Sequence, residues 1–321
     1  MNTLKILVVT NMYPDENYPT RGIFVKEQID LITRNDESIS VDVEDISKGD
    51  SRKATSKYLL SSFGLLFKIL KNKYDIIHVH YGLTSLPLLF ILPILKLSKF
   101  KFIITFHGSD ILGPNYIVRQ IARAAVKFFD LSICVSNEIF LSINTSNKIY
   151  LPCGVAPQFF QYDTKKNKFK KRIVFGSSPS RDVKNYPRFK FICELLRIDG
   201  YEFDVICLEN LNRDEIKNIL INSSCLLLTS KHEGSPQVVK ESIACNTPVV
   251  SVDVGDVSVI LDGLDNCVVS NIDKELDVAL RRVLTLQKNY DYSVRASEYD
   301  GTLIAKKLKS LYFKVIKIDN K

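Results

Sequence analysis

Short runs of β-branched and other apolar residues recur along the chain, separated by longer amphipathic or apolar segments. Each run has the length of a strand, and this alternation is typical of a parallel sheet with helical crossover connections. After about residue 170 the same pattern starts afresh. We therefore predict strands at residues 5–10, 75–80, 101–106 and 131–136 in the first half, and at residues 172–178, 203–209, 225–230, 247–253 and 267–270 in the second.

The chain length points to two domains, because 321 residues suit two cores of roughly 150 residues better than one. With 45% apolar and 25% charged residues, the composition is that of an ordinary folded protein. Six of the eight residues at 165–172 are basic, and they follow a stretch broken by Pro and Gly. We predict an α/β fold with an N-terminal Rossmann-like domain (1–153), a linker (154–170), a C-terminal Rossmann-like domain (171–302) and a closing helix (303–321) that packs back on the N-terminal domain.

The cysteines and the net charge narrow the class of protein. Seven cysteines, with no Cys-x-x-Cys pair, favour neither a disulfide framework nor a zinc site. A lone Lys5 precedes the first apolar run, which reads as a buried strand rather than a secretory signal, so we expect a cytoplasmic protein. The net charge of +8 favours an anionic partner. Without zinc-finger spacing, an RNA-binding aromatic signature or a basic heptad repeat, we expect no nucleic-acid partner.

The most specific pattern follows the strand predicted at residues 225–230. Glu233 and Glu241 stand eight positions apart, and a helix is expected over about residues 236–245 with Ser235 as its N-cap. The first amides of such a helix can bind a phosphate. A carboxylate can accept two hydrogen bonds from the vicinal hydroxyls of a sugar or ribose. Ligands of open α/β sheets lie beyond the carboxyl ends of the strands, where this segment falls.

A basic pair follows the strand predicted at residues 172–178, which contains Gly176. Arg181 and Lys184 come shortly after it. Two cations beside a nucleotide can stabilise the negative charge that develops on a departing diphosphate. The alternative interpretation is two exposed basic residues on a loop of a lysine-rich protein.

The N-terminal half offers two further candidate places, each after a predicted strand. A Pro-rich loop after the first strand reaches Arg21 and Gly22, where a ligand can approach the backbone. His107 and Asp110 follow the strand at residues 101–106. A lone histidine at such a place is more often structural than catalytic. Two more histidines, His78 and His80, alternate along the strand at 75–80 and point the same way, either into the strand packing or toward the mouth of a cleft.

The segment EGSPQVVKESIACNTPVV resembles the signature of the family-4 retaining glycosyltransferases, and its Glu-x7-Glu pair falls on Glu233 and Glu241. The resemblance implies that Glu233 contacts a donor sugar, that Glu241 binds the nucleotide ribose, and that the amides between them contact the diphosphate. Asn246 stands where that family usually has glycine, and Asn tolerates the left-handed conformation. The donor and nucleotide site that the resemblance implies comprises Gly22, Gly176, Gly234, Ser235, Pro236, Gln237, Val238 and Glu241.

The resemblance extends over most of the chain. The family carries an Arg and a Lys at the start of its second domain, although Ser177 and Ser178 stand where the Arg usually follows the glycine more closely. It also carries a glycine-bearing loop after the first strand and a His-Gly-x-Asp segment near the donor sugar. The resemblance thus implies catalytic roles for His107, Glu233, Arg181 and Lys184, and places Arg21 and Asp110 on the acceptor or donor side.

The resemblance also implies a fold and a function. The fold is GT-B, which has two Rossmann-like domains with a cleft between them. The resemblance implies a retaining glycosyltransferase of the hexosyl- or N-acetylhexosaminyl type, acting from a nucleotide-diphosphate sugar on a polysaccharide or lipid-linked oligosaccharide. It favours a UDP-sugar over a GDP-sugar and requires no metal and no other cofactor. Two alternatives stay open: a nucleotide-sugar epimerase of the same shape, and a non-catalytic membrane-surface subunit that binds nucleotide sugars.

A membrane surface is a further expected partner. Residues 48–73 contain seven basic residues against the single acid Asp50, and one face of the helix predicted there is lined by Leu59, Phe63, Leu66 and Leu70. A basic amphipathic helix can lie on an anionic membrane. An ordinary domain helix with solvated lysines is the alternative. The apolar run at 86–95 is too short to span a bilayer and predicts a buried crossover helix. We therefore expect peripheral association with the inner face of the cell membrane.

Overall fold

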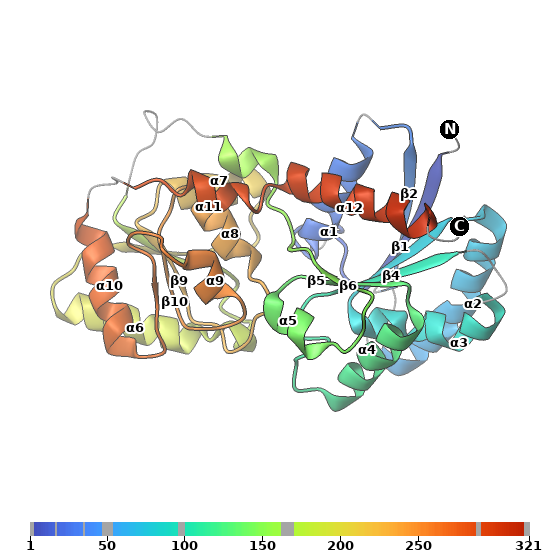
Figure 1. Ribbon diagram of the computed structural model, residues 1–321. Helices are drawn as coiled ribbons and strands as arrows, with labels where there is room; N and C mark the ends of the chain where they lie inside the picture. The colour runs from blue at the N-terminus through green and yellow to red at the C-terminus, as the bar shows by residue number, and fades with distance from the viewer. Residues whose placement is uncertain are drawn as a thin grey trace. The chain divides into compact units, whose positions relative to one another are not determined.

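The structure is a computed structural model that describes residues 3–16, 18–34, 36–46, 54–95, 100–161, 170–286 and 290–317. The chain divides into two compact units, one formed by Met1–Cys153 with Thr302–Lys321 and the other by Gly154–Gly301. Each unit is built on one parallel sheet with helices on both faces (Figure 1). The predicted α/β fold with two Rossmann-like domains is therefore confirmed.

The sheet of the first unit has its strands in the order β2-β1-β3-β4-β5-β6, all parallel. They are β1 (Leu4–Thr10), β2 (Ile39–Asp45), β3 (Ile76–His80), β4 (Lys101–Phe106), β5 (Leu131–Cys134) and β6 (Lys148–Tyr150). The four strands predicted in this half are present. The other two, β2 and β6, lie at the edges of the sheet, where a strand is only partly buried and its apolar run is correspondingly weak.

The sheet of the second unit has the order β11-β10-β9-β7-β8, again all parallel. Its strands are β7 (Arg172–Phe175), β8 (Asp204–Cys207), β9 (Cys225–Leu228), β10 (Val249–Ser251) and β11 (Val268–Val269). All five predicted strands are present, and each ends earlier than predicted because the residues at its carboxyl end already belong to a loop. The strand order reverses between β1 and β3 and between β7 and β9, and such switch points are where open α/β sheets bind ligands.

The helices cover both faces of each sheet. The first unit contains α1 (Ile23–Thr33), α2 (Ala54–Asn72), α3 (Leu86–Leu95), α4 (Tyr116–Phe128), α5 (Asn137–Ser142) and α12 (Gly301–Lys317). The second contains α6 (Tyr186–Ile198), α7 (Arg213–Ile221), α8 (Gln237–Ala244), α9 (Val257–Leu261), α10 (Asp273–Thr285) and α11 (Ser293–Ser297). One face of the second sheet packs against α6 and α10, and the other against α7, α8, α9 and α11 (Figure 1).

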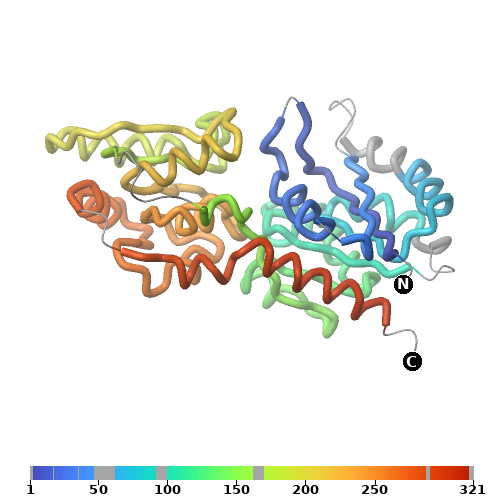
Figure 2. The backbone as a smooth tube through the Cα atoms, turned by 90° about the horizontal axis from the view of Figure 1, so that it is seen from above, coloured from blue at the N-terminus to red at the C-terminus, as the bar shows by residue number. Residues whose placement is uncertain are grey.

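The last helix, α12, completes the core of the first unit. Leu308, Tyr312 and Val315 are buried among residues of β1, β3 and α1. Figure 2 shows this helix, coloured red, running beside the blue and green elements of the N-terminal sheet. The hydroxyl of Tyr312 lies 2.7 Å from Nδ1 of His78, so the helix is also hydrogen-bonded to the middle of the sheet.

The segment predicted as a linker (154–170) is partly built into the second unit. Its first residues form part of the second unit: Val155 and Phe159 are fully buried in that unit's core. The amide of Val155 donates to the carbonyl of Tyr299, and the amide of Gly301 donates to Val155. The sequence did not reveal this because Pro and Gly break regular structure without excluding burial. Residues 162–169, which include three of the six basic residues of this stretch, lie outside the described residues.

Helix α2 presents a different stripe from the one predicted. Phe63 is 78% exposed and Leu70 is 51% exposed, but Leu66 packs partly against the core. Phe67, 68% exposed, takes its place in the exposed stripe. The side chain of Leu59 lies outside the described residues. Helix α3 is the predicted crossover helix, with Leu88 and Ile91 among its buried residues.

The hydrogen bond between α12 and β3 gives a first testable prediction. Replacing Tyr312 by Phe removes the hydroxyl and leaves Nδ1 of the fully buried His78 without that partner. We expect the free energy of unfolding to fall by about 1–3 kcal/mol, measured by urea denaturation. Tyr116→Phe is the control, because Tyr116 is 65% exposed, and it should change stability by less than about 0.5 kcal/mol. Equal effects of the two substitutions would contradict the assignment.

Candidate functional site

The switch point of the second unit begins where β7 ends, at Gly176. A Cβ atom at this position would lie 3.0 and 3.1 Å from the two methyl carbons of Val238 and 3.2 Å from Leu226. The glycine therefore allows the end of β7 to pack closely against the first turn of α8. Any larger residue would push the helix away from the sheet.

Lys184 and Glu233 meet at this switch point. Lys184 ends a short 3₁₀ helix, η4 (Asp182–Lys184), and its Nζ lies 2.5 Å from Oε1 of Glu233. Both side chains are mostly buried, with 13% and 12% exposed. The amide of Lys231 donates to Val183 over 2.8 Å, which holds the two loops together. Two residues singled out independently in the sequence, 49 positions apart, are thus an ion pair.

Arg181 begins the same loop but lies farther out. Its side chain is exposed, and Nη1 reaches only to 3.5 Å from the hydroxyl of Ser177. The guanidinium is therefore weakly held and can be moved by a ligand at little cost. Lys231, next along the neighbouring loop, pairs with Asp182 on the exposed side.

The start of α8 corrects one prediction. The helix begins at Gln237 and Pro236 occupies the N-cap position, so Ser235 is not the cap. The hydroxyl of Ser235 instead accepts a hydrogen bond from Nζ of Lys240 over 3.1 Å. The N-cap residue, Pro236, makes no side-chain hydrogen bond to the first amides of α8. A helix start of this kind can bind an anionic group.

Glu241 lies one helical turn deeper, and its side chain is only 4% exposed. Its Oε1 accepts a hydrogen bond of 2.6 Å from Nη2 of Arg213, the first residue of α7. The Arg213 guanidinium also lies over the ring of Phe159, 4.5 Å from its centroid. The sequence gave no signal for Arg213, because nothing local links it to a glutamate 28 positions away.

Three other residues around the Glu233 loop were missed. Gly255 has a φ of +59°, and a Cβ there would lie 2.7 Å from the carbonyl oxygen of Gly234. Lys240 is fully buried and Asp256 is 5% exposed. Burial raises the pKa of Asp256, and the positive charge of Lys240 opposes that rise. The loop is therefore held by close backbone packing at Gly255 and by the hydrogen bond from the buried Lys240 to Ser235.

In the first unit, the loop after β1 is fastened to itself. Gly22 has a φ of +60°, and a Cβ there would lie 2.3 Å from the carbonyl oxygen of Met12, so the close approach to this glycine is made by the protein's own backbone. The Arg21 guanidinium donates to the carbonyl of Tyr13 and pairs with Asp15 at 2.8 Å and Asp45 at 3.2 Å. Arg21 therefore holds the loop in place.

Asp110 lies beneath the turn that carries His107. It is completely buried, and its carboxylate accepts hydrogen bonds from the amides of Gly82, His107 and Gly108. Burial raises the pKa of this carboxyl, although the three amides work in the other direction. The carboxylate thus shapes the turn that carries His107.

His107 follows β4 and contacts several groups. Its Nε2 lies 3.2 Å from Nδ1 of His80, and its Nδ1 lies 3.9 Å from the sulfur of Cys153. Its ring packs against Phe24 at 5.1 Å between centroids. His78 and His80 are buried in strand packing, as one of the two interpretations of the sequence had it. Burial lowers the pKa of His80 to about 3 and that of His78 well below its usual value.

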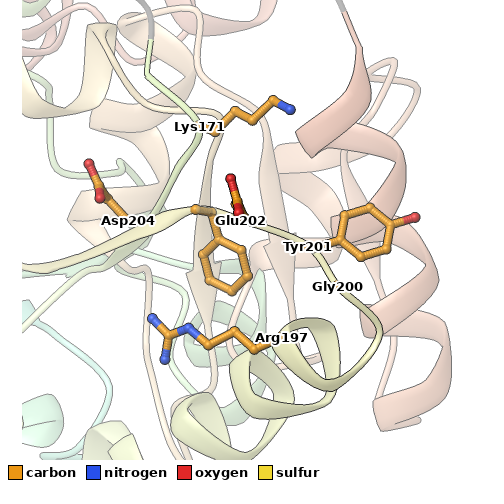
Figure 3. A pocket seen from close by; sticks show the side chains of 7 residues that line it. Lys171, Arg197, Gly200, Tyr201, Glu202 and Asp204 are labelled. Atoms are coloured by element: carbon orange, nitrogen blue, oxygen red, sulfur yellow. The ribbon is translucent and has the colours of Figure 1, made fainter.

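A cavity of about 680 Å3 lies elsewhere in the second unit. It is lined by Lys171, Arg197, Gly200, Tyr201, Glu202, Phe203 and Asp204. These residues precede β7 and β8, at the amino ends of the strands, and the labelled charged side chains point in different directions (Figure 3). The cavity thus lies away from the carboxyl ends of the strands, and its charged side chains do not converge on one point. We therefore do not assign a function to it.

The part of the chain that the structure describes holds neither a group of metal ligands nor a helix that could span a membrane. No three His, Cys, Asp or Glu side chains gather there as metal ligands. Within the same ranges, the helices fall short of the length and apolar content that crossing a bilayer requires.

Comparison with known proteins places both units in glycosyltransferase families. Residues 13–143 match the family described as Glycosyltransferase Family 4, and residues 168–299 match Glycosyl transferases group 1. The chain is 21% identical over 296 residues to N-acetyl-alpha-D-glucosaminyl L-malate synthase of Bacillus anthracis, an alignment that covers 78% of this chain and 77% of that protein.

Solved structures share the fold. Sucrose-phosphate synthase of Thermosynechococcus elongatus superposes with a TM-score of 0.77 at 13% identity, covering 99% of this chain and 100% of the other. HepE of Anabaena in complex with UDP superposes with a TM-score of 0.68 at 13% identity, covering 97% and 100%. Because successive parts of the chain match these two family models and the fold is that of solved glycosyltransferases, the protein belongs to the GT-B glycosyltransferases of group 1 and family 4.

Proposed function

We propose that the protein transfers a sugar from a UDP-sugar to a polysaccharide or lipid-linked oligosaccharide acceptor with retention of configuration. The single observation that carries the donor site is the buried Lys184–Glu233 ion pair beside the uncapped start of α8. The acceptor class and the retention come from the resemblance of the Glu-x7-Glu segment. This proposal requires that the product be a glycoside and not an epimerised donor sugar.

The ion pair supports a donor site because its two members suit the two ends of a sugar diphosphate. The Lys184 ammonium can turn to the phosphate, and the Glu233 carboxylate can accept hydrogen bonds from sugar hydroxyls. In the absence of a ligand the two charges neutralise each other, which limits the cost of keeping them mostly buried. As the diphosphate leaves, negative charge grows beside Lys184 and Arg181, and fixed cations at that place stabilise the transition state.

The Glu241–Arg213 pair supports recognition of the nucleotide ribose. Arg213 holds one carboxylate oxygen of Glu241, which fixes the direction of the other. A carboxylate fixed in this way can accept hydrogen bonds from the two ribose hydroxyls. The complexes of Anabaena HepE with UDP and with UDP-glucose favour UDP as the nucleotide. In this proposal His107 acts at the donor sugar, and Arg21 and Asp110 hold the loops that follow β1 and β4 in place. No metal is required.

Ribose recognition gives the first test of this function. We expect UDP to bind the wild type more tightly than GDP, and more tightly than 2′-deoxy-UDP, in titration calorimetry. Glu241→Gln should weaken UDP binding by about 10- to 100-fold, because a hydrogen bond to a charged group contributes about 1.5–3 kcal/mol. The same variant should bind UDP and 2′-deoxy-UDP alike.

Glu194→Gln is the control for that titration, because Glu194 is exposed on α6 and pairs with Lys190 across one turn. It should bind UDP as the wild type does. A well-folded wild type that binds neither UDP nor GDP would contradict the donor site.

The role of Lys184 gives a second test. Lys184→Met should lower kcat for UDP release by about 10²- to 10³-fold, with a much smaller change in KM, because the ammonium acts on charge that develops only in the transition state. Lys231→Met is the control. It removes a cation on the neighbouring loop whose partner is the exposed Asp182, and it should leave kcat within about twofold of the wild type. A Lys184→Met enzyme that keeps its kcat would refute this role.

Peripheral membrane association on the cytoplasmic side is part of the proposal. The exposed stripe of α2 (Phe63, Phe67 and Leu70) is joined by Lys71, whose ammonium lies 5.9 Å from the Phe67 ring centroid. An apolar stripe flanked by cations suits the surface of an anionic bilayer.

Flotation with vesicles of phosphatidylglycerol and phosphatidylcholine tests this association. At physiological salt we expect the wild type to float and the Phe63→Ser/Phe67→Ser variant to stay in the dense fraction. Tyr116→Ser, at an exposed aromatic residue on α4, should float like the wild type. Wild-type protein that does not float would rule out this association.

A further inference from the structure

We infer that His80 is a positioning residue that holds the ring of His107 through a hydrogen bond to Nε2, so that Nδ1 is the ring nitrogen that meets the ligand. This inference rests on the proposed role of His107 at the donor sugar. It concerns a contact between two side chains of the first unit, and neither comparison nor sequence pattern assigns a function to His80.

The backbone brings the two rings together. His80 is the last residue of β3, and His107 directly follows β4, the strand that pairs with β3 in parallel with His80 opposite Thr105. Nδ1 of His80 lies 3.2 Å from Nε2 of His107. The ring planes differ by 19°, and the centroids are 5.4 Å apart. The two imidazoles therefore meet edge by edge through facing nitrogens.

The ring of His80 is itself held firmly. It is 2% exposed, and its centroid lies 4.4 Å from that of His78. His78 is fixed at both nitrogens, by Thr105 at 2.8 Å and by Tyr312 at 2.7 Å. His80 is thus a rigid partner, whereas His107 is only half-buried. A rigid, buried partner can determine the orientation of a more accessible one.

The protonation states give this contact its chemical meaning. A neutral imidazole donates with one nitrogen and accepts with the other. Because burial keeps His80 neutral, one nitrogen of the facing pair carries the hydrogen and the other accepts it. The bond therefore fixes the orientation of the His107 ring and couples its tautomer to that of His80, and hence whether Nδ1 donates or accepts.

The other side of the His107 ring is suited to exchange of partners. Nδ1 faces the sulfur of Cys153 at 3.9 Å, and a thiol is a weak hydrogen-bonding group. A sugar hydroxyl can replace such a contact at small cost. The contact with His80 lies on the buried side, so Nε2 keeps its partner when the ligand binds.

Two isosteric substitutions separate this role from simple space filling. Asn places its amide nitrogen near the position of imidazole Nδ1, whereas Phe keeps a ring against His78 but has no hydrogen-bonding atom. Positioning through the hydrogen bond requires that His80→Asn preserve the state of His107 and that His80→Phe lose it. A role in ring packing alone requires the reverse order.

Nitrogen NMR of protein labelled with 15N-histidine tests this without substrate. The chain has only four histidines, His78, His80, His107 and His232, so the His107→Gln variant assigns the His107 signals. In the wild type at pH 8 we expect the two His107 nitrogens to show the separate shifts of one tautomer. His80→Asn should keep these shifts, and His80→Phe should move them toward each other as the tautomers mix.

Unchanged His107 shifts in His80→Phe would overturn the inference. If that variant does not fold, His80→Leu decides in its place, because leucine is smaller and has no hydrogen-bonding atom; unchanged His107 shifts there would equally overturn it. In the transferase assay kcat should fall about tenfold in His80→Phe, the loss of one hydrogen bond, and less in His80→Asn. Full activity of His107→Gln would instead refute the proposed role of His107 and leave the NMR result standing.

Discussion

The parallel pairing of the strands is the constraint on which the rest of the structure depends. In each unit every strand runs the same way, so all carboxyl ends meet at one edge of the sheet. Loops that follow different strands are thereby brought together, whatever their separation in the chain. Lys184, after β7, meets Glu233, after β9, and His80, at the end of β3, meets His107, after β4. These candidate residues of both units lie at or beyond the carboxyl ends of the strands, while the strands and helices fix the spacing of the loops.

The strands and the helical segments could be predicted because burial on both faces leaves a strong local pattern. Strands β1 and β9 are nearly continuous apolar runs, and the edge strands β2 and β6 were missed because they are only partly buried. Asn246 has a φ of +54°, the left-handed conformation expected where the family has glycine. Its side chain also bonds to the carbonyl of Tyr290 and the amide of Tyr292, which a glycine could not do.

The candidate site was predictable in its residue types but not in its pairings. Nothing in the sequence indicates that Arg213 pairs with Glu241 or that Asp110 is buried beneath three amides, because these contacts depend on how distant loops fold over one another. Ser235 was taken for an N-cap on local grounds. Pro236 instead has an extended ψ of 115° and stands at the cap position, and the Ser235 hydroxyl binds a buried ammonium. Tertiary contacts here outweigh a local preference.

The return of α12 to the first unit has a consequence for how the protein is made. Ile6, Val8 and Ile133 lie on the sheet face that this helix covers, and its buried residues come from the last stretch of the described chain. A growing polypeptide synthesises that sheet first and its cover last, after the whole second unit has been translated. Until then the face presents apolar residues to water, and the nascent chain must be kept from aggregating through that surface. The second unit, continuous from Gly154 to Gly301, has no such delay.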